Sequence, residues 1–149
     1  MDNADEILIS LKPKYADHIF EGSKTVELRK RRLNVEPGTR VWIYATTPVA
    51  ALRGYAKLAY VKTGTPAQIW RTLGKQTGVS KDEFEAYFDT SKQAHALVLT
   101  EVMEMKKTLS LVQIREAVGN FHPPQFYCHL NGARKLMHLS SRKYEAVKR

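Results

Sequence analysis

The chain of 149 residues has little cysteine and no long apolar segment. Cys128 is its only cysteine, so an internal disulfide is excluded and a reducing, cytoplasmic setting is the default expectation. No stretch approaches the roughly 18 consecutive apolar residues that a membrane-spanning helix needs. The first residues also lack a cationic start followed by an apolar run. We therefore expect neither a signal peptide nor a membrane partner.

Glycine and proline are also sparse, with 8 and 6 residues, and internal repeats and low-complexity tracts are absent. A hydrophobic content of 43% over this length is enough to bury a core. These features predict one globular domain over residues 1–149, with a basic C-terminal tail from about residue 134. No glycine-rich phosphate loop and no regular alternation of strand and helix are present, which disfavours a doubly wound nucleotide-binding fold.

Carboxylates are missing from residues 37–81, whereas seven lysine or arginine residues lie in that stretch. The last 16 residues carry six more cationic side chains against one carboxylate, and the net charge of the whole chain is +9. This asymmetry is typical of proteins that bind polyanions, with an affinity that falls as salt rises. RNA or another nucleic acid is the partner we expect, and an acidic protein partner is the alternative.

Local patterns predict an α+β fold. Thr65, Ser80 and Ser110 each start a helix as capping residues, and Pro37-Gly38 predicts a type II turn within a hairpin. A further turn is expected around residues 106–107. Strands are expected at 6–12, 25–29, 40–46, 51–62, 94–102 and 125–130, and helices at 13–21, after each cap, and at 144–148. Short strands interleaved with short helices predict a small mixed β-barrel with helices packed on its outside.

The stretch from Gly22 to Arg32 concentrates the polar chemistry, since five of its eleven residues are cationic and one is a carboxylate. Glu27 and Arg29 alternate with apolar neighbours and so share one face of the predicted strand. They lie about 7 Å apart, because a strand rises about 3.3 Å per residue. We expect Lys24 at the mouth of that face.

This group could bind a nucleobase flanked by phosphate. A carboxylate accepts hydrogen bonds from an exocyclic amine, and arginine or lysine donates to a carbonyl or phosphate oxygen. The alternative is a solvated edge strand whose charges only prevent pairing with other chains.

Three blocks in this order resemble the ASCH domain of the PUA-like superfamily. They are Ile9-Ser-Leu-Lys-Pro13, the motif Gly22-x-Lys24-x-x-Glu27-x-Arg29, and the run from Pro37 to Val49. The resemblance covers most of the chain. It implies a small PUA-like β-barrel in which Lys24, Glu27 and Arg29 line a cleft beside an outer helix, with Thr46 at the cleft rim. It also implies a role with nucleic acid, because relatives in the superfamily bind RNA or read modified bases.

The resemblance leaves a binding module and two enzymes open. Similar small proteins deacetylate N4-acetylcytidine with a lysine, a threonine and an acid. Here Lys24 matches, but Glu27 occupies the threonine position and residues 75–78 contain no carboxylate, so this activity is disfavoured although Thr25 lies nearby. A ribonuclease could use Glu27 and Lys24 as base and acid with Arg29 near the phosphate. His18 is a further candidate, but an exposed helix position is the simpler interpretation.

Other candidate sites carry weaker signals. His122, Cys128, His129 and His138 lack the usual spacing of metal ligands, so we expect no metal and no cofactor. Trp42, Tyr44, Tyr55 and Tyr60 could stack bases, but aromatic residues that alternate on strands are more often core. We predict that phosphate is held by the charges after the motif, by one strand residue and by the tail: Lys30, Arg31, Arg32, Arg53, Arg142 and Lys143.

Overall fold

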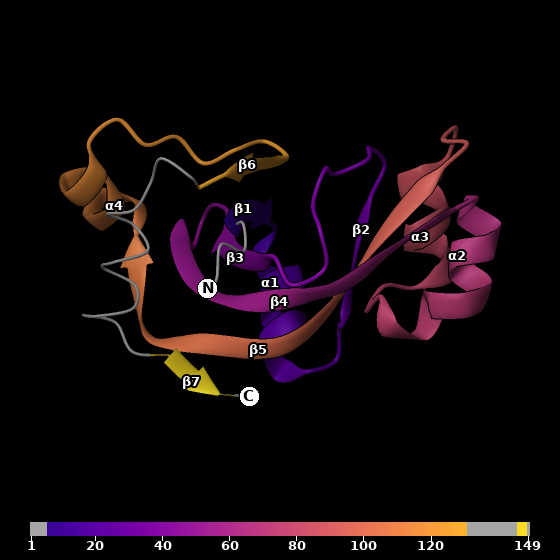
Figure 1. The fold of residues 1–149 in the computed structure, drawn as a ribbon, viewed down its shortest axis with the longest axis horizontal. Coiled ribbons are helices and arrows are strands. Elements are labelled where there is room, and N and C mark those ends of the chain that lie inside the picture. Colours follow the sequence, from indigo (N-terminus) through magenta and orange to yellow (C-terminus); the bar gives the residue numbers. More distant parts are fainter. Residues whose placement is uncertain (1–5, 131–145, 149) are drawn as a thin grey trace.

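The computed structural model describes residues 6–130 and 146–148. Its strands form one mixed sheet in the order β2-β5-β4-β3-β1-β6, and β7 pairs with β5 (Figure 1). The strands are β1 (Glu6–Leu11), β2 (Val26–Arg29), β3 (Arg40–Ala45), β4 (Ala51–Gly64), β5 (Ala94–Ser110), β6 (Tyr127–His129) and β7 (Ala146–Lys148). The helices are α1 (Pro13–Glu21), α2 (Pro66–Leu73), the 3₁₀ helix η1 (Gly74–Gln76), α3 (Lys81–Phe88) and α4 (Leu111–Val118).

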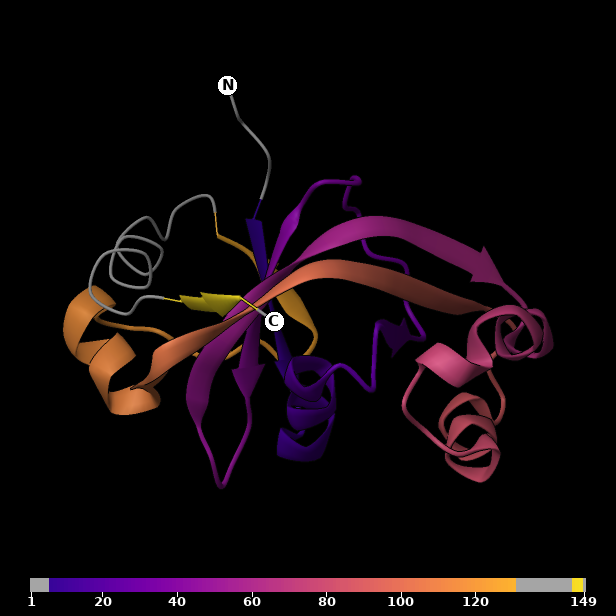
Figure 2. The same cartoon turned by 90° about the horizontal axis from the view of Figure 1, so that it is seen from below.

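The sheet is a half-barrel built around two long strands. β4 and β5 pair antiparallel along most of their length and arch over α1 (Figure 2). α2 and α3 lie at one end of the arch, and α4 lies at the other (Figure 1). The predicted α+β class, with a small mixed barrel-like sheet and short helices, is confirmed.

Bulges produce the curvature of β4. The pairing register with β5 shifts between Leu52 and Gly54 and at two later points in the strand. At Gly54 a side chain would collide with the backbone oxygen of Met103 and would lie 2.8 Å from the Phe20 ring, so glycine permits the close approach of β4 to these neighbours. The shifts also change which face a residue occupies. Tyr60, predicted to share the buried face of this strand, is therefore 46% exposed.

Two predicted turns differ from the structure. The turn at Pro37-Gly38 is present, with Thr39 donating to the carbonyl of Glu36 at 3.1 Å, but it closes no hairpin. β2 pairs antiparallel with β5, whereas β3 pairs with β1 and β4. The two strands belong to different cores, since β2 packs against α2 and α3 and β3 packs against α1. The turn predicted around residues 106–107 is also wrong, because β5 continues to Ser110.

The helix starts follow the capping residues as predicted. Thr65, Ser80 and Ser110 each accept a hydrogen bond from the third residue of their helix and complete a capping box. Gly22 ends α1 in the left-handed conformation with φ 91°. The helix predicted at 144–148 is wrong where it is described, because Ala146–Lys148 is a strand paired with β5. Within the described residues, no helix has the length and apolar character to span a membrane.

Candidate functional site

The motif predicted from the sequence lines a cleft of about 350 Å³. Its walls come from the end of β1, the start of α1, Lys24 ahead of β2, β2 itself, α3, and the segment that leads into β6. These segments are far apart in the sequence. β1 directly precedes α1 in the chain and β2 follows it, which brings these three elements together. α3 packs against the apolar residues of β2.

Lys24 lies inside this cleft and not at its mouth, which corrects the sequence-based expectation. Its residue surface is 2% exposed, and its ammonium Nζ donates to the carbonyl oxygen of Thr77 at 2.7 Å. Nζ also forms an ion pair with Glu27 Oε1 at 3.4 Å. Burial lowers the pKa of Lys24 below its usual value, and the Glu27 charge opposes that shift. A lysine in this setting loses its proton at a lower pH than a lysine on the surface.

The chain path after α1 explains the burial of Lys24. The backbone nitrogens of Ser23 and Lys24 both donate to the carbonyl of His18, which folds the chain back after Gly22. The segment after η1 then covers the lysine. A side-chain carbon placed at Gly78 would lie 2.9 Å from Lys24 Cβ, so this backbone packs directly on the lysine stem.

Glu27 and Arg29 share the opposite face of β2 from its apolar residues, as predicted. β2 is an edge strand, but Glu27 and Arg29 are only 7% and 8% exposed, so the solvated-strand alternative is wrong. Arg29 Nη2 lies 3.1 Å from Glu27 Oε2, and Nη1 donates to the carbonyl oxygen of Phe126 at 3.2 Å. The carboxylate therefore lies between two cations. The buried triad carries one net positive charge.

Two buried polar atoms at the cleft have no hydrogen-bond partner among the described residues. They are Arg29 Nε and the hydroxyl oxygen of Ser10. Buried polar groups are nearly always paired, and leaving one unpaired costs about 1–3 kcal/mol. Both atoms belong to residues that line the cleft.

An ion pair joins the two helices at the cleft rim. Lys14 Nζ of α1 lies 3.0 Å from Glu83 Oε2 of α3. The hydrogen bond from the Ser80 backbone, followed by that from Lys14, lowers the pKa of Glu83 to about 2. Glu83 therefore stays ionised at any physiological pH.

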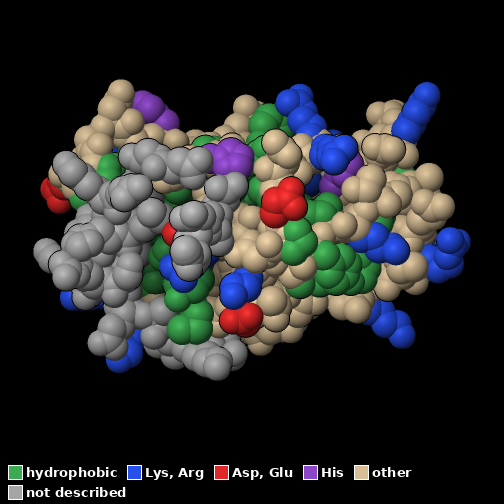
Figure 3. Space-filling view, viewed as in Figure 1, with side chains coloured by type: hydrophobic (Ala, Val, Ile, Leu, Met, Phe, Trp, Pro, Cys, Tyr) green, Lys and Arg blue, Asp and Glu red, His purple; other side chains and the backbone are tan. Residues whose placement is uncertain are grey.

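The cationic residues that follow the motif are exposed and border a second pocket. This adjoining pocket measures about 460 Å³ and is lined by residues 29–33 together with Tyr87, Phe126 and Tyr127. Lys30, Arg31 and Arg32 are exposed, so the structure brings three of the predicted phosphate-binding side chains next to the triad. On the face shown in Figure 3, Lys and Arg side chains clearly outnumber acidic ones.

Other predicted site residues lie elsewhere. Arg53 forms ion pairs with Asp17 at 2.7 Å and Glu104 at 3.3 Å, and it lines neither the cleft nor the adjoining pocket. Thr46 is held by a hydrogen bond from its nitrogen to the carbonyl of Leu11, a cleft-lining residue. The phosphate contacts predicted for Arg142 and Lys143, and the candidate ligand His138, fall outside the described residues.

Two aromatic residues of the site could not be singled out from the sequence. Tyr87 lies on the helix predicted after Ser80, and Phe126 falls in the strand predicted at 125–130. They are 41% and 44% exposed and line both cavities. Trp42 and Tyr44 are core residues, as their alternation predicted, at 1% and 2% exposure.

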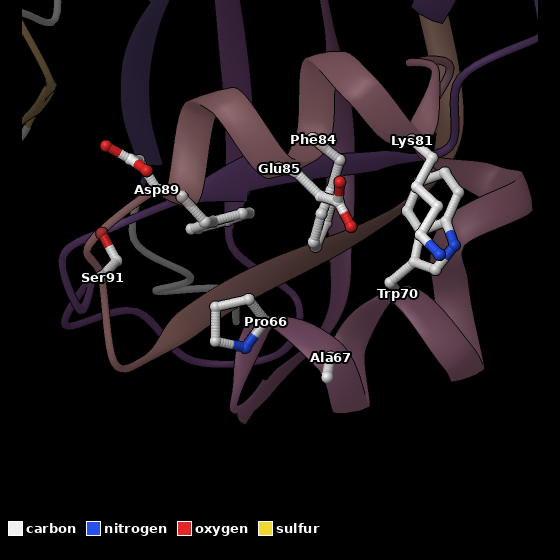
Figure 4. Close-up of a pocket in the computed structure, with 9 residues that line it drawn as sticks. Pro66, Ala67, Trp70, Lys81, Phe84, Glu85, Asp89 and Ser91 are labelled. Atoms are coloured by element: carbon white, nitrogen blue, oxygen red, sulfur yellow. The ribbon is translucent and has the colours of Figure 1, made fainter.

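A third cavity lies between α2 and α3. It measures about 360 Å³, and Pro66, Ala67 and Trp70 of α2 face Phe84 and Glu85 of α3 across it (Figure 4). It contains no residue of the motif. Elsewhere, the half-buried Cys128 packs against the core cluster around Trp42, and burial raises the pKa of its thiol. Such a thiol is a poor nucleophile.

Comparison with known proteins agrees with the resemblance of the three sequence blocks. A family model described as a domain of unknown function (DUF365) matches residues 6–122. An ASCH domain-containing ribonuclease of Zymomonas mobilis is 34% identical over 138 residues, which cover 91% of this chain and 93% of that protein. The large ribosomal subunit protein uL22 of Ureaplasma parvum is 28% identical over 118 residues, which cover 79% of this chain but only 38% of that protein.

Solved structures give the same result for the fold. The crystal structure of ASCH from Zymomonas mobilis superposes with a TM-score of 0.84 at 34% identity, covering 90% of this chain and 94% of that one. The N-terminal domain of McrB from Staphylothermus marinus has a TM-score of 0.53 at 15% identity over 92% and 93% of the two chains, which is a likeness of fold alone. From the extent of the first relative and of the family match, the chain belongs to the ASCH domain family.

Proposed function

We propose that this protein binds single-stranded RNA and holds one nucleotide in the cleft lined by Lys24, Glu27 and Arg29. The observation that carries the proposal is the buried triad of Lys24, Glu27 and Arg29, whose charges pair with one another. The exposed cations of residues 30–32 lie beside it in the adjoining pocket. Burying three charges is unfavourable for stability, so a ligand site is a physical reason to keep them. The ribonuclease name of the Zymomonas relative supports RNA as the ligand.

The two parts of the site have different roles. Lys30, Arg31 and Arg32 are exposed and contact phosphate, which supplies affinity that depends on salt and little on sequence. The triad selects the base, because its carboxylate accepts from an exocyclic amine while its cations donate to a carbonyl. A single unstacked strand is required, since a base that is stacked and paired within a duplex cannot enter the cleft.

RNA cleavage is the second candidate function, and two observations favour it. The Zymomonas relative is named a ribonuclease at 34% identity over 91% of this chain. Burial also lowers the pKa of Lys24, which lies 3.4 Å from the carboxylate of Glu27. Cleavage through the 2′-hydroxyl needs a base, an acid and a cation near the phosphate, and Glu27, Lys24 and Arg29 supply these groups.

Fluorescence anisotropy of a labelled ten-nucleotide RNA across a salt series tests the binding proposal. We compare the wild type with the double variant Arg31→Gln/Arg32→Gln. Removing two phosphate contacts should flatten the slope of log affinity against log salt by about 0.7 for each cation. The matched control is Arg71→Gln/Lys107→Gln, which removes the same charge from two exposed positions that line neither cavity.

The outcomes separate the hypotheses. A flatter slope in the first double variant only supports the proposed interface. Equal flattening in both variants means that the protein binds polyanions through its total charge, and no binding at low salt rejects the proposal. Running the RNA on a gel afterwards detects cleavage, which should be lost in Lys24→Met if the triad is catalytic.

A further inference from the structure

The adjoining pocket and the cleft share a wall. Arg29, Tyr87 and Phe126 line both cavities, which measure about 460 and 350 Å³. Each volume lies within the range of about 300–1,000 Å³ that is usual for small-ligand sites. Two ligand groups joined by a short linker could therefore occupy the two cavities with this wall between them.

The shared wall presents aromatic rings with cations beside them. Tyr87 and Phe126 are 41% and 44% exposed, so part of each ring is open to solvent. The Lys30 ammonium lies 4.8 Å from the centre of the Tyr87 ring, and Arg31 Cζ lies 4.6 Å from the centre of the Phe126 ring. Exposed rings interleaved with cations are the arrangement by which proteins stack the bases and hold the phosphates of single strands.

Arg29 is the polar part of the same wall. Its two terminal nitrogens bond to the Phe126 carbonyl, the Ser10 carbonyl and Glu27, but its Nε has no partner within the described residues. The residue is 8% exposed, so this donor is buried and its lack of a partner is costly. An acceptor atom of a ligand at the wall would satisfy it.

We propose that the adjoining pocket binds the nucleotide next to the one in the cleft, so that the smallest complete ligand is a dinucleotide. One base enters the cleft, and its neighbour stacks on Phe126 or Tyr87 in the adjoining pocket. The phosphate that joins them lies at the shared wall, close to Arg29 and Arg31. This inference rests on the proposed RNA-binding function and adds the length and strand path of the ligand.

The test measures affinity against ligand length. Cytidine ligands of one, two and three nucleotides compete with a labelled ten-nucleotide RNA, because cytosine carries both an exocyclic amine and a carbonyl. All have 2′-fluoro sugars, so that cleavage through the 2′-hydroxyl cannot occur. Stacking one base on an aromatic ring corresponds to about a 5- to 150-fold gain in affinity. We expect the dinucleotide to compete better than the mononucleotide by a factor in that range, and the third nucleotide to add less.

Phe126→Ala should weaken the dinucleotide by a larger factor than the mononucleotide and so reduce the advantage of the dinucleotide. The change keeps the backbone carbonyl that accepts from Arg29. Phe126→Trp should restore the advantage. The matched control is Tyr60→Ala, since Tyr60 is a 46% exposed aromatic on β4 that lines neither cavity. If Phe126→Ala does not fold, Arg31→Gln serves instead, because it leaves the ring in place and should weaken the dinucleotide more than the mononucleotide.

Failure of the inference differs from failure of the proposed function. Equal affinity of one and two nucleotides overturns the second pocket while leaving RNA binding intact. The second pocket is also overturned if Phe126→Ala weakens the mononucleotide and the dinucleotide by the same factor. The ring would then contact only the nucleotide in the cleft. If even the labelled ten-nucleotide RNA fails to bind at low salt, the proposed function itself is rejected.

Discussion

Glu27 is expected to contribute more to stability than Lys24, although the two form one ion pair. Removing the Lys24 charge with Lys24→Met keeps the aliphatic stem and leaves Glu27 paired with Arg29 at 3.1 Å. Removing the Glu27 charge with Glu27→Gln leaves two buried cations that face each other without a counter-charge. The order of the two effects follows from this asymmetry.

The contacts that each variant loses set the size of its destabilisation. In Lys24→Met the carbonyl of Thr77 loses a donor at 2.7 Å, and a buried unsatisfied acceptor costs about 1–3 kcal/mol. In Glu27→Gln a buried charge is left uncompensated, which costs about 3–5 kcal/mol. Lys24 can relieve this strain by losing its proton, because burial already lowers its pKa. Near neutral pH we therefore expect a difference of about 2 kcal/mol between the two variants.

The lowered pKa of Lys24 makes the stability of the protein depend on pH. The pKa of Lys24 is lower in the folded state than in the unfolded chain, where it is near 10.5. Between these two pKa values the unfolded chain therefore binds more protons than the folded protein. Stability therefore rises with pH between the folded and unfolded pKa values, by at most about 1.4 kcal/mol per pH unit. The deficit of Glu27→Gln should shrink between pH 7 and pH 9, whereas that of Lys24→Met should not, because it has no titrating lysine there.

Urea unfolding at both pH values, followed by circular dichroism, measures these free energies. The exposed Lys14 provides the control, because its pairing with Glu83 is a surface contact and Lys14→Met should change stability little. The reasoning is refuted if Lys24→Met destabilises more than Glu27→Gln at pH 7. A Glu27→Gln deficit that does not change with pH would contradict the proposed proton loss.

Three further outcomes are expected. Gly54→Ala should destabilise more than Gly22→Ala in thermal unfolding, because its new carbon meets the Met103 carbonyl and the Phe20 ring, whereas at Gly22 only the left-handed backbone opposes it, at about 1–2 kcal/mol. An NMR titration should find the Glu83 carboxyl ionising near pH 2. The contribution of this carboxylate to stability is complete above about pH 4.5 and is lost as pH falls through 2. A pKa near 4.5 would refute the hydrogen bond from the Ser80 backbone and the Lys14 contact. Trp42→Ala should cost about 3–5 kcal/mol in the same unfolding assay, since Trp42 is 1% exposed in the core, and a loss below 1 kcal/mol would contradict that packing.

Most of the fold could be predicted where a local signal decided the outcome. Capping residues fixed the helix starts at Thr65, Ser80 and Ser110, and alternation identified the core face of β2. The failures required long-range information. The absence of a hairpin after β2 depends on two separate cores, and the exposure of Tyr60 depends on bulges that alternation does not reveal.

The candidate site shows the same division. Residue spacing predicted that Glu27 and Arg29 share a face with Lys24 beside them, and the three side chains do meet. Their burial could not be predicted, because it depends on α3 and on a segment about 100 residues later in the chain. For the same reason the wall residues Tyr87 and Phe126 had no local signal. The assignment of Arg53 to phosphate stays a prediction, and in the structure its guanidinium is paired with Asp17 and Glu104.

The central claim is that RNA occupies the cleft and the pocket beside it. The most direct measurement is a two-dimensional amide NMR titration of the protein with an uncleavable 2′-fluoro trinucleotide. We predict the largest shifts at Lys24, at residues 27–33, and at Tyr87 and Phe126, with little change around Arg71 and in α4. Shifts confined to the α2–α3 cavity, to α4 or to scattered surface lysines would contradict it.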